Sequence, residues 1–421
     1  MLDITLLREK LDWVKERLKG KMQDLELLDE FPKIDEEFRK IVKIRDDKRS
    51  EQNKIAKEIG KLKREGKNPE ELMFKAKKLS EEIKAIEKRV KEIEEKRKEL
   101  LLKIPNIPHE SVPDEDRIVK EGGIKREFKF NPIPAHQLCE MLDIVDFKRG
   151  AKIAGTHFPC FKGDGALLER ALINFMLDFH RKKGYIEVLP PFLCNRKSMF
   201  STGHLPKFEE DMYLIEEEDF FLNPTAEVPL INLHRDEKLN EEDLPLKYVG
   251  YTACFRREAG AYGADTRGLQ RVHQFDKVEL IKFTKPEDSF EELEKMLEDA
   301  EEIIKQLELP YRIVLLSKSE MSFSSAKTYD IEVWAPATGK WLEVSSVSNC
   351  TDFQSRRANI RLKRKDGRLD YVHTLNGSGV ALPRTFIAIV ENFQQSDGSV
   401  VVPDVLRPYM GGRGRVGAAR T

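Results

Sequence analysis

The sequence predicts an α+β protein in which a long N-terminal helical hairpin precedes a larger body of helices and antiparallel strands. Two observations support this prediction. A charged stretch with heptad spacing spans residues 33–104 and is interrupted near its middle by Gly66 and Pro69. Further along, residues 248–282 have the pattern of a strand, a polar loop and a second strand. A chain of 421 residues is long enough for two domains.

Composition excludes several classes of protein. Apolar residues make up 40% of the chain and charged residues 35%. No apolar run approaches the roughly 18 residues that span a bilayer, so we expect no membrane partner. The five cysteines are scattered without a CxxC pair, which argues against structural zinc or a disulfide scaffold and favours a reducing cytoplasm. The N-terminus is charged throughout and lacks the apolar region of a signal peptide.

The N-terminal hundred residues are predicted to be helical. A short amphipathic helix is expected over residues 4–19, and residues 33–104 then predict an antiparallel coiled-coil arm. Gly66 and Pro69 break the heptad run, so its two halves cannot form one rod. Helices of about 30 residues at 1.5 Å per residue make an arm of roughly 45 Å. The seam of the second half, interrupted only by Arg97, is Leu72, Ala76, Leu79, Ile83, Ile86, Val90, Ile93, Arg97, Leu100 and Ile104.

The predicted arm is basic. Residues 33–104 hold 24 lysines and arginines against 17 aspartates and glutamates, a charge of +7 in a chain whose total is −1. A basic projection on an acidic body suits a polyanion such as RNA. The alternative is an ordinary charged coiled coil that mediates dimerisation, and the charge pattern alone favours that alternative.

A proline-rich stretch, IPNIPHESVP, marks a domain boundary. We therefore expect residues 1–104 to form the arm domain, 105–113 a linker and 114–421 a catalytic domain. Within that last domain a helix with a broad apolar stripe is expected over residues 164–183. A strand hairpin is expected over residues 328–350.

Polar side chains gather at three places in the body. Phe275, Lys277 and Glu279 share one face of a predicted strand. On the return strand of the 328–350 hairpin, Glu343 and Ser345 are expected to share a face, and an acid with hydroxyls suits Mg²⁺.

The third place is the stretch around residue 380. The small residues 376–379 would let the backbone approach a ligand closely. Pro383 then starts a helix with Arg384 in its first turn, which favours a phosphate. The alternative here is a helix start packed in the core, and the alternative for residues 248–282 is a surface hairpin with solvated charges.

Three stretches resemble the motifs of the class II aminoacyl-tRNA synthetases, in the form typical of seryl-tRNA synthetases. LLERALINFMLDFHRKKGYIEVLPPFL (167–193) is similar to motif 1, residues 248–282 to motif 2, and NGSGVALPRTFIAIVENFQ (376–394) to motif 3. The resemblance runs nearly end to end. It implies an antiparallel-sheet class II catalytic domain, a homodimer built on motif 1, and an arm that lies across tRNA.

The resemblance implies a serine–tRNA ligase that activates L-serine with ATP and Mg²⁺. It would then charge tRNA(Ser), and also tRNA(Sec), which the arm and the motif 2 loop would contact. Arg256, Arg384 and Glu343 would be catalytic, and Glu343 and Ser346 would hold Mg²⁺ with the ATP phosphates. The implied ATP site comprises Arg256, Arg257, Glu258, Val272, Phe275, Glu343, Val344, Ser345, Ser346 and Arg384. The implied serine site comprises Thr225, Ala226, Glu227, Arg256, Glu279, Asn376 and Ser378.

Two other functions are weighed against this one. An amino-acid ligase that charges a carrier protein would lack the long arm, so residues 33–104 argue against it. A non-catalytic, synthetase-derived RNA-binding coiled-coil scaffold would not need Arg256, Glu279, Glu343 and Arg384. Without the resemblance, the residue patterns indicate a soluble enzyme with a phosphate-and-carboxylate site and a basic arm. The identity of the amino acid and of the RNA comes from the resemblance.

Overall fold

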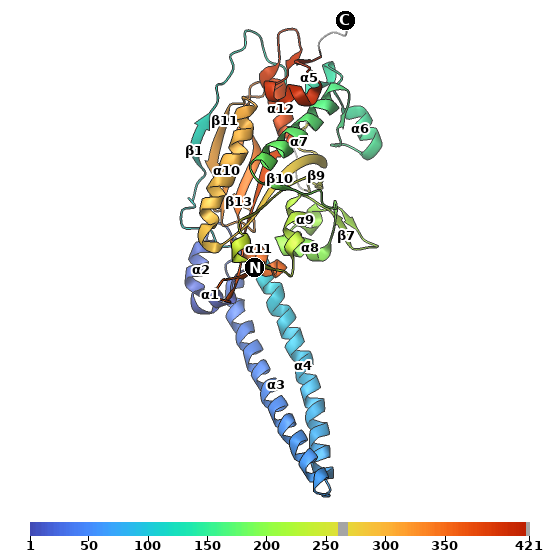
Figure 1. Cartoon of the computed structure of the whole chain (residues 1–421), viewed down its shortest axis with the longest axis vertical. Helices are drawn as coiled ribbons and strands as arrows, with labels where there is room; N and C mark the ends of the chain where they lie inside the picture. Colours follow the sequence, from blue (N-terminus) through green and yellow to red (C-terminus); the bar gives the residue numbers. More distant parts are fainter. Residues whose placement is uncertain (260–267, 418–421) are drawn as a thin grey trace. The chain divides into compact units, whose positions relative to one another are not determined.

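The computed structural model describes residues 1–259 and 268–417. It confirms the predicted α+β class and the N-terminal helical hairpin (Figure 1). The chain divides into two compact units, Leu2–Pro105 on the one hand and Met1 with Asn106–Thr421 on the other. Part of the predicted motif 2 loop, with Gly260 and Gly263, lies outside the described residues.

The first unit consists of four helices. They are α1 (Ile4–Glu9), α2 (Leu11–Leu18), α3 (Leu27–Arg64) and α4 (Glu70–Lys103). The single helix expected over residues 4–19 is therefore wrong. Lys10 has φ −137° and ψ 37°, outside the helical region, so it ends α1 and precedes α2. The apolar stripe is kept across this break, since Leu7, Val14 and Leu18 are all buried.

Helices α3 and α4 form the arm. Gly66 lies in the turn between them with φ +67°, a conformation that favours glycine. Ile55 packs against Leu79 and Ile83 in the seam. Ion pairs cross between the helices, as between Lys48 and Glu82 at 2.6 Å. The two heptad patterns thus bury one shared apolar seam and leave their charges outside.

Arg97, the exception in the heptad pattern, has a buried partner. Arg97 Nη1 lies 2.9 Å from Asp35 Oδ1, and Arg8 Nε lies 2.7 Å from Asp35 Oδ2. The Arg97 guanidinium also lies 3.8 Å from the centroid of the Phe38 ring. Burial raises the pKa of Asp35, but the hydrogen bonds from Arg8 and Arg97 outweigh it and leave that pKa below its usual value. An arginine at a seam position is thus accommodated by a three-residue ion cluster.

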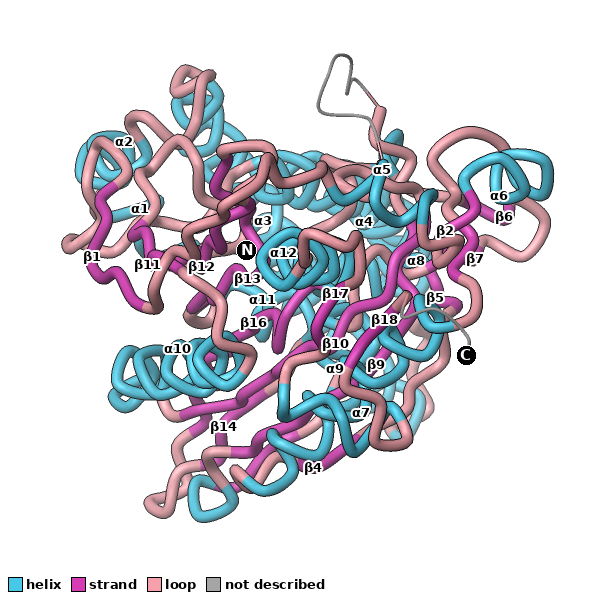
Figure 2. Tube along the Cα trace, turned by 90° about the horizontal axis from the view of Figure 1, so that it is seen from above, coloured by secondary structure: helices cyan, strands magenta, loops and turns pink. Residues whose placement is uncertain are grey.

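The second unit is built on an eight-stranded sheet with the order β1-β11-β12-β13-β16-β10-β9-β4, which Figure 2 shows from above. Neighbouring strands are antiparallel except β4 and β9, which are parallel. The strands are β1 (Arg117–Gly122), β4 (Ile186–Glu187), β9 (Leu246–Phe255), β10 (Gln274–Thr284), β11 (Tyr311–Leu315), β12 (Lys327–Ala335), β13 (Lys340–Asn349) and β16 (His373–Ala381).

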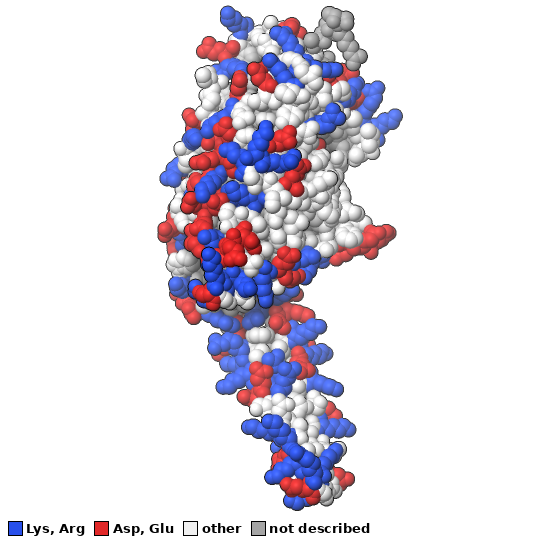
Figure 3. Space-filling view, viewed as in Figure 1, with Lys and Arg blue, Asp and Glu red and all other residues white. Residues whose placement is uncertain are grey.

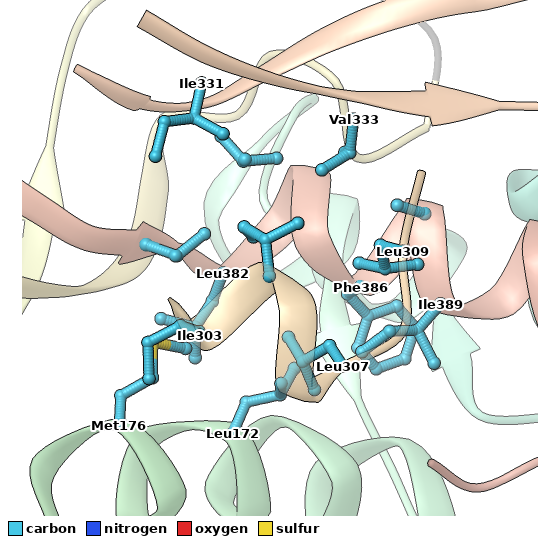
Figure 4. Packing of buried hydrophobic residues seen from close by; sticks show 14 of the residues in the cluster. Leu172, Met176, Ile303, Leu307, Leu309, Ile331, Val333, Leu382, Phe386 and Ile389 are labelled. Atoms are coloured by element: carbon cyan, nitrogen blue, oxygen red, sulfur yellow. The ribbon is translucent and has the colours of Figure 1, made fainter. Parts of the chain in front are cut away.

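Three helices cover one face of this sheet: α7 (Asp164–Lys182), α10 (Ser289–Gln306) and α12 (Leu382–Phe393). Figure 4 shows side chains of all three meeting strand β12 in one apolar cluster. Each fully buried large apolar side chain contributes about 1.5–3 kcal/mol relative to an exposed one. Packing against the helices therefore holds the strands in place, and polar residues can occupy the opposite face of the sheet.

The remaining elements are short. The helices are α5 (Ala135–Met141), α6 (Phe147–Ala154), α8 (Arg196–Thr202), α9 (Glu227–Ile231) and α11 (Phe353–Ala358), with 3₁₀ turns at Glu209–Asp211, Asn232–His234, Glu241–Asp243, Pro286–Asp288 and Asp404–Met410. The small sheets contain β2 (Val145–Asp146), β3 (Cys160–Phe161), β5 (Leu193–Asn195), β6 (Leu214–Ile215), β7 (Phe220–Leu222), β8 (Lys238–Asn240), β14 (Arg361–Lys363), β15 (Leu369–Tyr371), β17 (Val400–Val401) and β18 (Arg415–Val416). Within residues 1–259 and 268–417, no helix combines the length and the apolar character needed to cross a membrane.

Candidate functional site

Strand β10 organises the site. Val278 and Leu280 belong to the helix-covered core, so Lys277 and Glu279 between them face the opposite side of the sheet. Two adjoining cavities open on that side. Five residues line both of them: Arg256, Lys277, Glu343, Ser346 and Ser378. The cavities therefore meet at a junction with two cations, an acid and two hydroxyls.

The first cavity collects most of the residues predicted to bind ATP. From that prediction it contains Arg256, Glu258, Val272, Phe275, Glu343, Ser346 and Arg384. Leu269, Gln270, Arg271, Lys277, Ser378, Ala381 and Pro383 complete its wall. Arg256 lies 5.1 Å from the centroid of the Phe275 ring, and its Nε donates to Pro224 O at 3.3 Å. A cation beside an aromatic face at the mouth of a cavity suits a flat base that carries phosphates.

Arg384 lies where helix α12 begins. Its Nη1 donates to the Glu343 carbonyl oxygen at 2.9 Å and lies 3.3 Å from Glu343 Oε2, and its Nε donates to Gln270 O at 3.4 Å. The helix has Ala381 as its N-cap and begins at Leu382, one residue before the Pro383 start that the sequence predicted, and Arg384 lies in its first turn as predicted. The guanidinium is thus held at the positive end of a helix dipole, a position that favours an anion.

The expectation that Glu343 and Ser345 share a face of their strand is wrong. Ile331 pairs with Ser345 while Glu332 pairs with Glu343, so Val344 is an extra residue in a β-bulge. Beyond the bulge the alternation is reversed, and Glu343 and Ser346 line the cavities together. Val344 packs into the core, and Ser345 Oγ donates to Ser378 O at 2.6 Å. An ATP contact by Val344 and Ser345 stays a prediction for their backbone.

Asp330 lies behind Glu343 and Ser346. It is paired with Ser346 across strands β12 and β13. Its Oδ1 atom is buried and has no hydrogen-bond partner among the described residues. Burial and the neighbouring Glu343 raise the pKa of Asp330 to about 8. The carboxylate and hydroxyl predicted to hold Mg²⁺ therefore have a third oxygen group directly behind them.

The second cavity collects the residues predicted to bind serine. Thr225, Glu227, Arg256, Glu279, Asn376 and Ser378 line it, while Ala226 packs into the core behind them. Glu279 Oε2 lies 2.5 Å from Lys277 Nζ and accepts a hydrogen bond from Thr225 Oγ1 at 3.3 Å. The same hydroxyl accepts a hydrogen bond from the backbone N–H of Glu227 at 3.2 Å. Thr225 thus connects the Glu279 carboxylate to the backbone of Glu227 through its one hydroxyl group.

Glu227 is held by two amides from distant parts of the chain. Gln354 Nε2 donates to Glu227 Oε1 at 2.6 Å, and Asn376 Nδ2 donates to the same oxygen at 3.0 Å. Burial and the nearby Glu279 raise the pKa of Glu227 to about 7. The cavity therefore holds one carboxyl group whose pKa is raised, beside a second acid that is paired with a lysine.

His204 closes this cavity on another side. Burial, together with the charges of Arg256 and Lys277, lowers the pKa of His204 to about 3, so its ring is neutral. Its Nδ1 lies 2.8 Å from Thr202 Oγ1. Sequence reasoning missed His204 and Gln354, which lie in segments without a chemical pattern. It placed Lys277 on the correct strand face but gave it no role.

The glycines near residue 378 pack closely against the helices. A Cβ atom on Gly377 would lie 3.1 Å from Met296 Sδ, and one on Gly379 would lie 3.1 Å from His180 Nε2. Both neighbours belong to the helices that cover the opposite face of the sheet. Close helix–strand packing is thus a reason for glycine at both positions, and the approach of this backbone to a ligand stays a prediction.

Arg257 and Glu258 follow strand β9 at the edge of the site. The Arg257 amide donates to Asp211 O at 2.9 Å, and Glu258 Oε2 accepts from Arg271 Nη1 at 3.3 Å. Among the described residues no cluster of three His, Cys, Asp or Glu side chains has the arrangement of a metal site.

Comparison with known proteins gives matches along the whole chain. A model of the tRNA synthetase class II core domain (G, H, P, S and T) matches residues 207–393, and a model of the seryl-tRNA synthetase N-terminal domain matches residues 1–108. The serine–tRNA ligase of Caldicellulosiruptor saccharolyticus is 56% identical over 98% of this chain and 99% of its own. That of Pelotomaculum thermopropionicum is 52% identical over 99% of this chain and 100% of its own. The structure of a Pyrococcus horikoshii seryl-tRNA synthetase complexed with ATP has a TM-score of 0.91 at 38% identity, with 99% of both chains covered.

Proposed function

The chain belongs to the seryl-tRNA synthetase family of the class II aminoacyl-tRNA synthetases, and we propose that its two adjoining cavities are the ATP site and the serine site. It is an ATP-dependent serine–tRNA ligase. Such an enzyme joins serine to ATP as seryl-adenylate with release of pyrophosphate, and then transfers serine to the 3′ end of tRNA. The relatives match over the full length of the chain, and nothing in them favours a non-catalytic scaffold.

The junction of the two cavities is the observation that supports this assignment. In adenylate formation an oxygen of the serine carboxylate attacks the α-phosphorus of ATP, so the amino acid and the nucleotide must meet end to end. Arg256, Glu343 and Ser346 line both cavities where they join. The protein has only to align the reactants and stabilise the charge on the phosphoryl oxygens, which cations and fixed donors can do.

The roles follow from the lining of each cavity. Arg256 would contact the α-phosphate and the serine carboxylate, and Phe275 would stack on adenine. Arg384, at the start of helix α12, would contact the γ-phosphate. In the other cavity Thr225, Glu227 and Glu279 would bind the serine ammonium. A pocket that pairs the serine hydroxyl should reject alanine, because its buried polar groups would be left unpaired.

Mg²⁺ is proposed from the chemistry of the donors. Glu343 and Ser346 present a carboxylate and a hydroxyl to the phosphate side of the junction. Oxygen ligands completed by phosphates and water are what Mg²⁺ prefers. When bound, it would neutralise negative charge on the phosphates. Glu343→Gln should raise the Mg²⁺ concentration required for half-maximal pyrophosphate exchange.

We propose that the α3–α4 arm and the motif 2 loop bind tRNA(Ser), and tRNA(Sec) as well. Lysine and arginine side chains are spread along the arm with acidic ones between them (Figure 3). Recognition by such a surface would depend on phosphates and shape more than on base edges.

A homodimer is proposed for the edge of the large sheet. Strand β4 is the outermost strand there, and Ile186, Leu189 and Leu193 in and after it are exposed apolar residues. An apolar, unpaired edge is a liability in a lone chain, and a second copy related by a two-fold axis would cover it. The enzyme would act in the cytoplasm, where protein synthesis supplies its substrates.

The test of the site assignment is amino-acid-dependent ATP–pyrophosphate exchange without tRNA, run with each of the twenty amino acids. Exchange with serine alone is expected, and Arg256→Ala should abolish it. Unchanged exchange by the Arg256→Ala variant would show that the reaction occurs elsewhere on the protein.

A further inference from the structure

A buried ion pair occupies the point where the two cavities meet. Lys277 Nζ lies 2.5 Å from Glu279 Oε2, and the two side chains are 9% and 2% exposed. They stand two residues apart on strand β10 and so point the same way. A charge this deeply buried must be paired, because an isolated one is strongly destabilising.

Lys277 lies at the junction, with Arg256 as the other cation there. It lines the cavity assigned to ATP and also the cavity assigned to serine. Glu279 lines only the serine cavity, where it accepts a hydrogen bond from Thr225. The positive end of the ion pair therefore points toward the ATP side, and the negative end lies within the amino-acid side.

We propose that serine binds by opening this ion pair, with its ammonium group taking the place of Lys277 on Glu279 and its carboxylate binding Lys277. The inference rests on the proposed assignment of the serine cavity. An amino acid is a zwitterion, so its ammonium group can pair with Glu279 and its carboxylate with Lys277. One buried ion pair becomes two, and no buried charge is left without a partner at any stage.

Glu279 is the acid best placed to accept the ammonium. The Oε1 atom of Glu227 already accepts hydrogen bonds from Gln354 and Asn376. Glu279 by contrast is held by the terminal amine of a lysine side chain and by Thr225. The lysine contact is the one that a substrate cation can replace.

Lys277 is then a catalytic residue, because it contacts the reacting carboxylate beside Arg256. A carboxylate oxygen of serine forms the new bond to the α-phosphorus, and the bond from that phosphorus to the pyrophosphate oxygen breaks. Lys277 would stabilise the oxygens on which negative charge gathers. The same contact would exclude amines that carry no carboxylate.

The experiment compares two ligands, serine and serinamide, which differ in the carboxylate alone. Their affinities for the wild type and for Lys277→Met are measured by calorimetry, below the pKa of both amino groups. The variant should bind serine about 10- to 100-fold more weakly, the range expected when a charge-assisted hydrogen bond is removed. It should bind serinamide as well as the wild type or better, because no competing cation remains on Glu279.

Two further variants make every outcome decisive. Glu279→Gln should weaken both ligands, and if it weakens neither, the serine-site assignment is wrong. The proposal fails if Glu279→Gln weakens the binding of serine and of serinamide, and Lys277→Met also weakens the binding of the two ligands by equal factors. Lys277 would then only position Glu279. Lys277→Gln is one atom shorter, keeps a donor but removes the charge, and should show the same selective weakening of serine binding if the methionine variant does not fold.

Discussion

Arg384 Nη1 contacts Glu343 twice, through the backbone carbonyl at 2.9 Å and through the carboxylate at 3.3 Å. The two residues come from helix α12 and strand β13, so this contact connects the predicted phosphate-binding arginine to the predicted metal-binding acid. An ATP phosphate that binds Arg384 would displace the carboxylate and leave it for a cation.

Arg384→Gln is predicted to lower kcat/KM for ATP in pyrophosphate exchange by about 100-fold, because the variant cannot make a charge-assisted hydrogen bond to phosphate. Steady-state exchange at varied ATP gives this value. Arg368→Gln is the matched control, since Arg368 is an exposed arginine paired with Asp366 away from the cavities. Equal effects of the two substitutions would contradict a role for Arg384 in binding phosphate.

Glu227→Gln is predicted to stabilise the protein relative to the wild type as the pH rises. Burial and Glu279 raise the pKa of Glu227 to about 7 from an ordinary 4.5, so the folded protein keeps a proton that the unfolded chain releases. The unfolding free energy of the wild type therefore falls as the pH rises from 4.5 to about 7, and that of the Glu227→Gln variant does not. The gap in unfolding free energy should widen by at most about 1.4 kcal/mol per pH unit.

Urea unfolding of both proteins across this pH range measures that gap. A constant difference from acid to neutral pH would mean that Glu227 titrates normally. Exchange activity should fall in the same variant, since Glu227 lines the proposed serine cavity and its Oε1 atom holds the amides of Gln354 and Asn376 in place.

Asp35→Ala is predicted to destabilise the arm by about 3–5 kcal/mol, because Arg8 and Arg97 are left without their buried partner. The loss in unfolding free energy is measured by following the helical circular dichroism signal during denaturation. Asp46→Ala is the control, since Asp46 pairs with Arg45 on the surface and should cost less than about 0.5 kcal/mol.

Acid should act in the same direction as the Asp35→Ala substitution. The folded-state pKa of Asp35 is lowered, so its contribution is complete above the ordinary value of 3.8 and is lost as the pH falls further. An arm that stays equally stable below that value would contradict the ion cluster.

The outcome at particular residues shows what the sequence could predict. The heptad seam and the break at Gly66 predicted the arm, because helix periodicity is a local property. Arg256, Glu279 and Arg384 came from motifs with family-specific spacing. The bulge at Val344 could not be read from alternation, since it depends on the register with the neighbouring strand. Gln354 and His204 were missed because only the folded chain brings them beside Glu227 and Arg256.

Replacing Lys61, Lys67 and Lys75 by glutamine is predicted to weaken tRNA charging without changing serine-dependent exchange. All three are exposed on the arm. For each phosphate that a lysine no longer neutralises, the slope of log affinity against log salt should fall by roughly one. Filter binding at several salt concentrations provides the slope, and an unchanged slope would remove these lysines from the tRNA interface.

Leu189→Asp is predicted to convert a dimer into a monomer, because it places a charge beside the apolar edge at β4, where this leucine is 75% exposed. Ile124→Asp changes a similarly exposed apolar residue, 85% exposed, at the other end of the sheet and should leave the mass unchanged. Sedimentation or light scattering distinguishes the two states. A wild-type monomer would refute the proposed homodimer directly.

Glu227 depends on Gln354 and Asn376, which follow it by 127 and 149 residues. A nascent chain that has not yet reached residue 376 lacks both the amide that completes this acid's environment and the strand that faces Glu279. The proposed serine cavity can therefore form only after residue 376 has been synthesised. A fragment that ends before residue 376 is therefore expected to leave serine free for the chains that have passed that point.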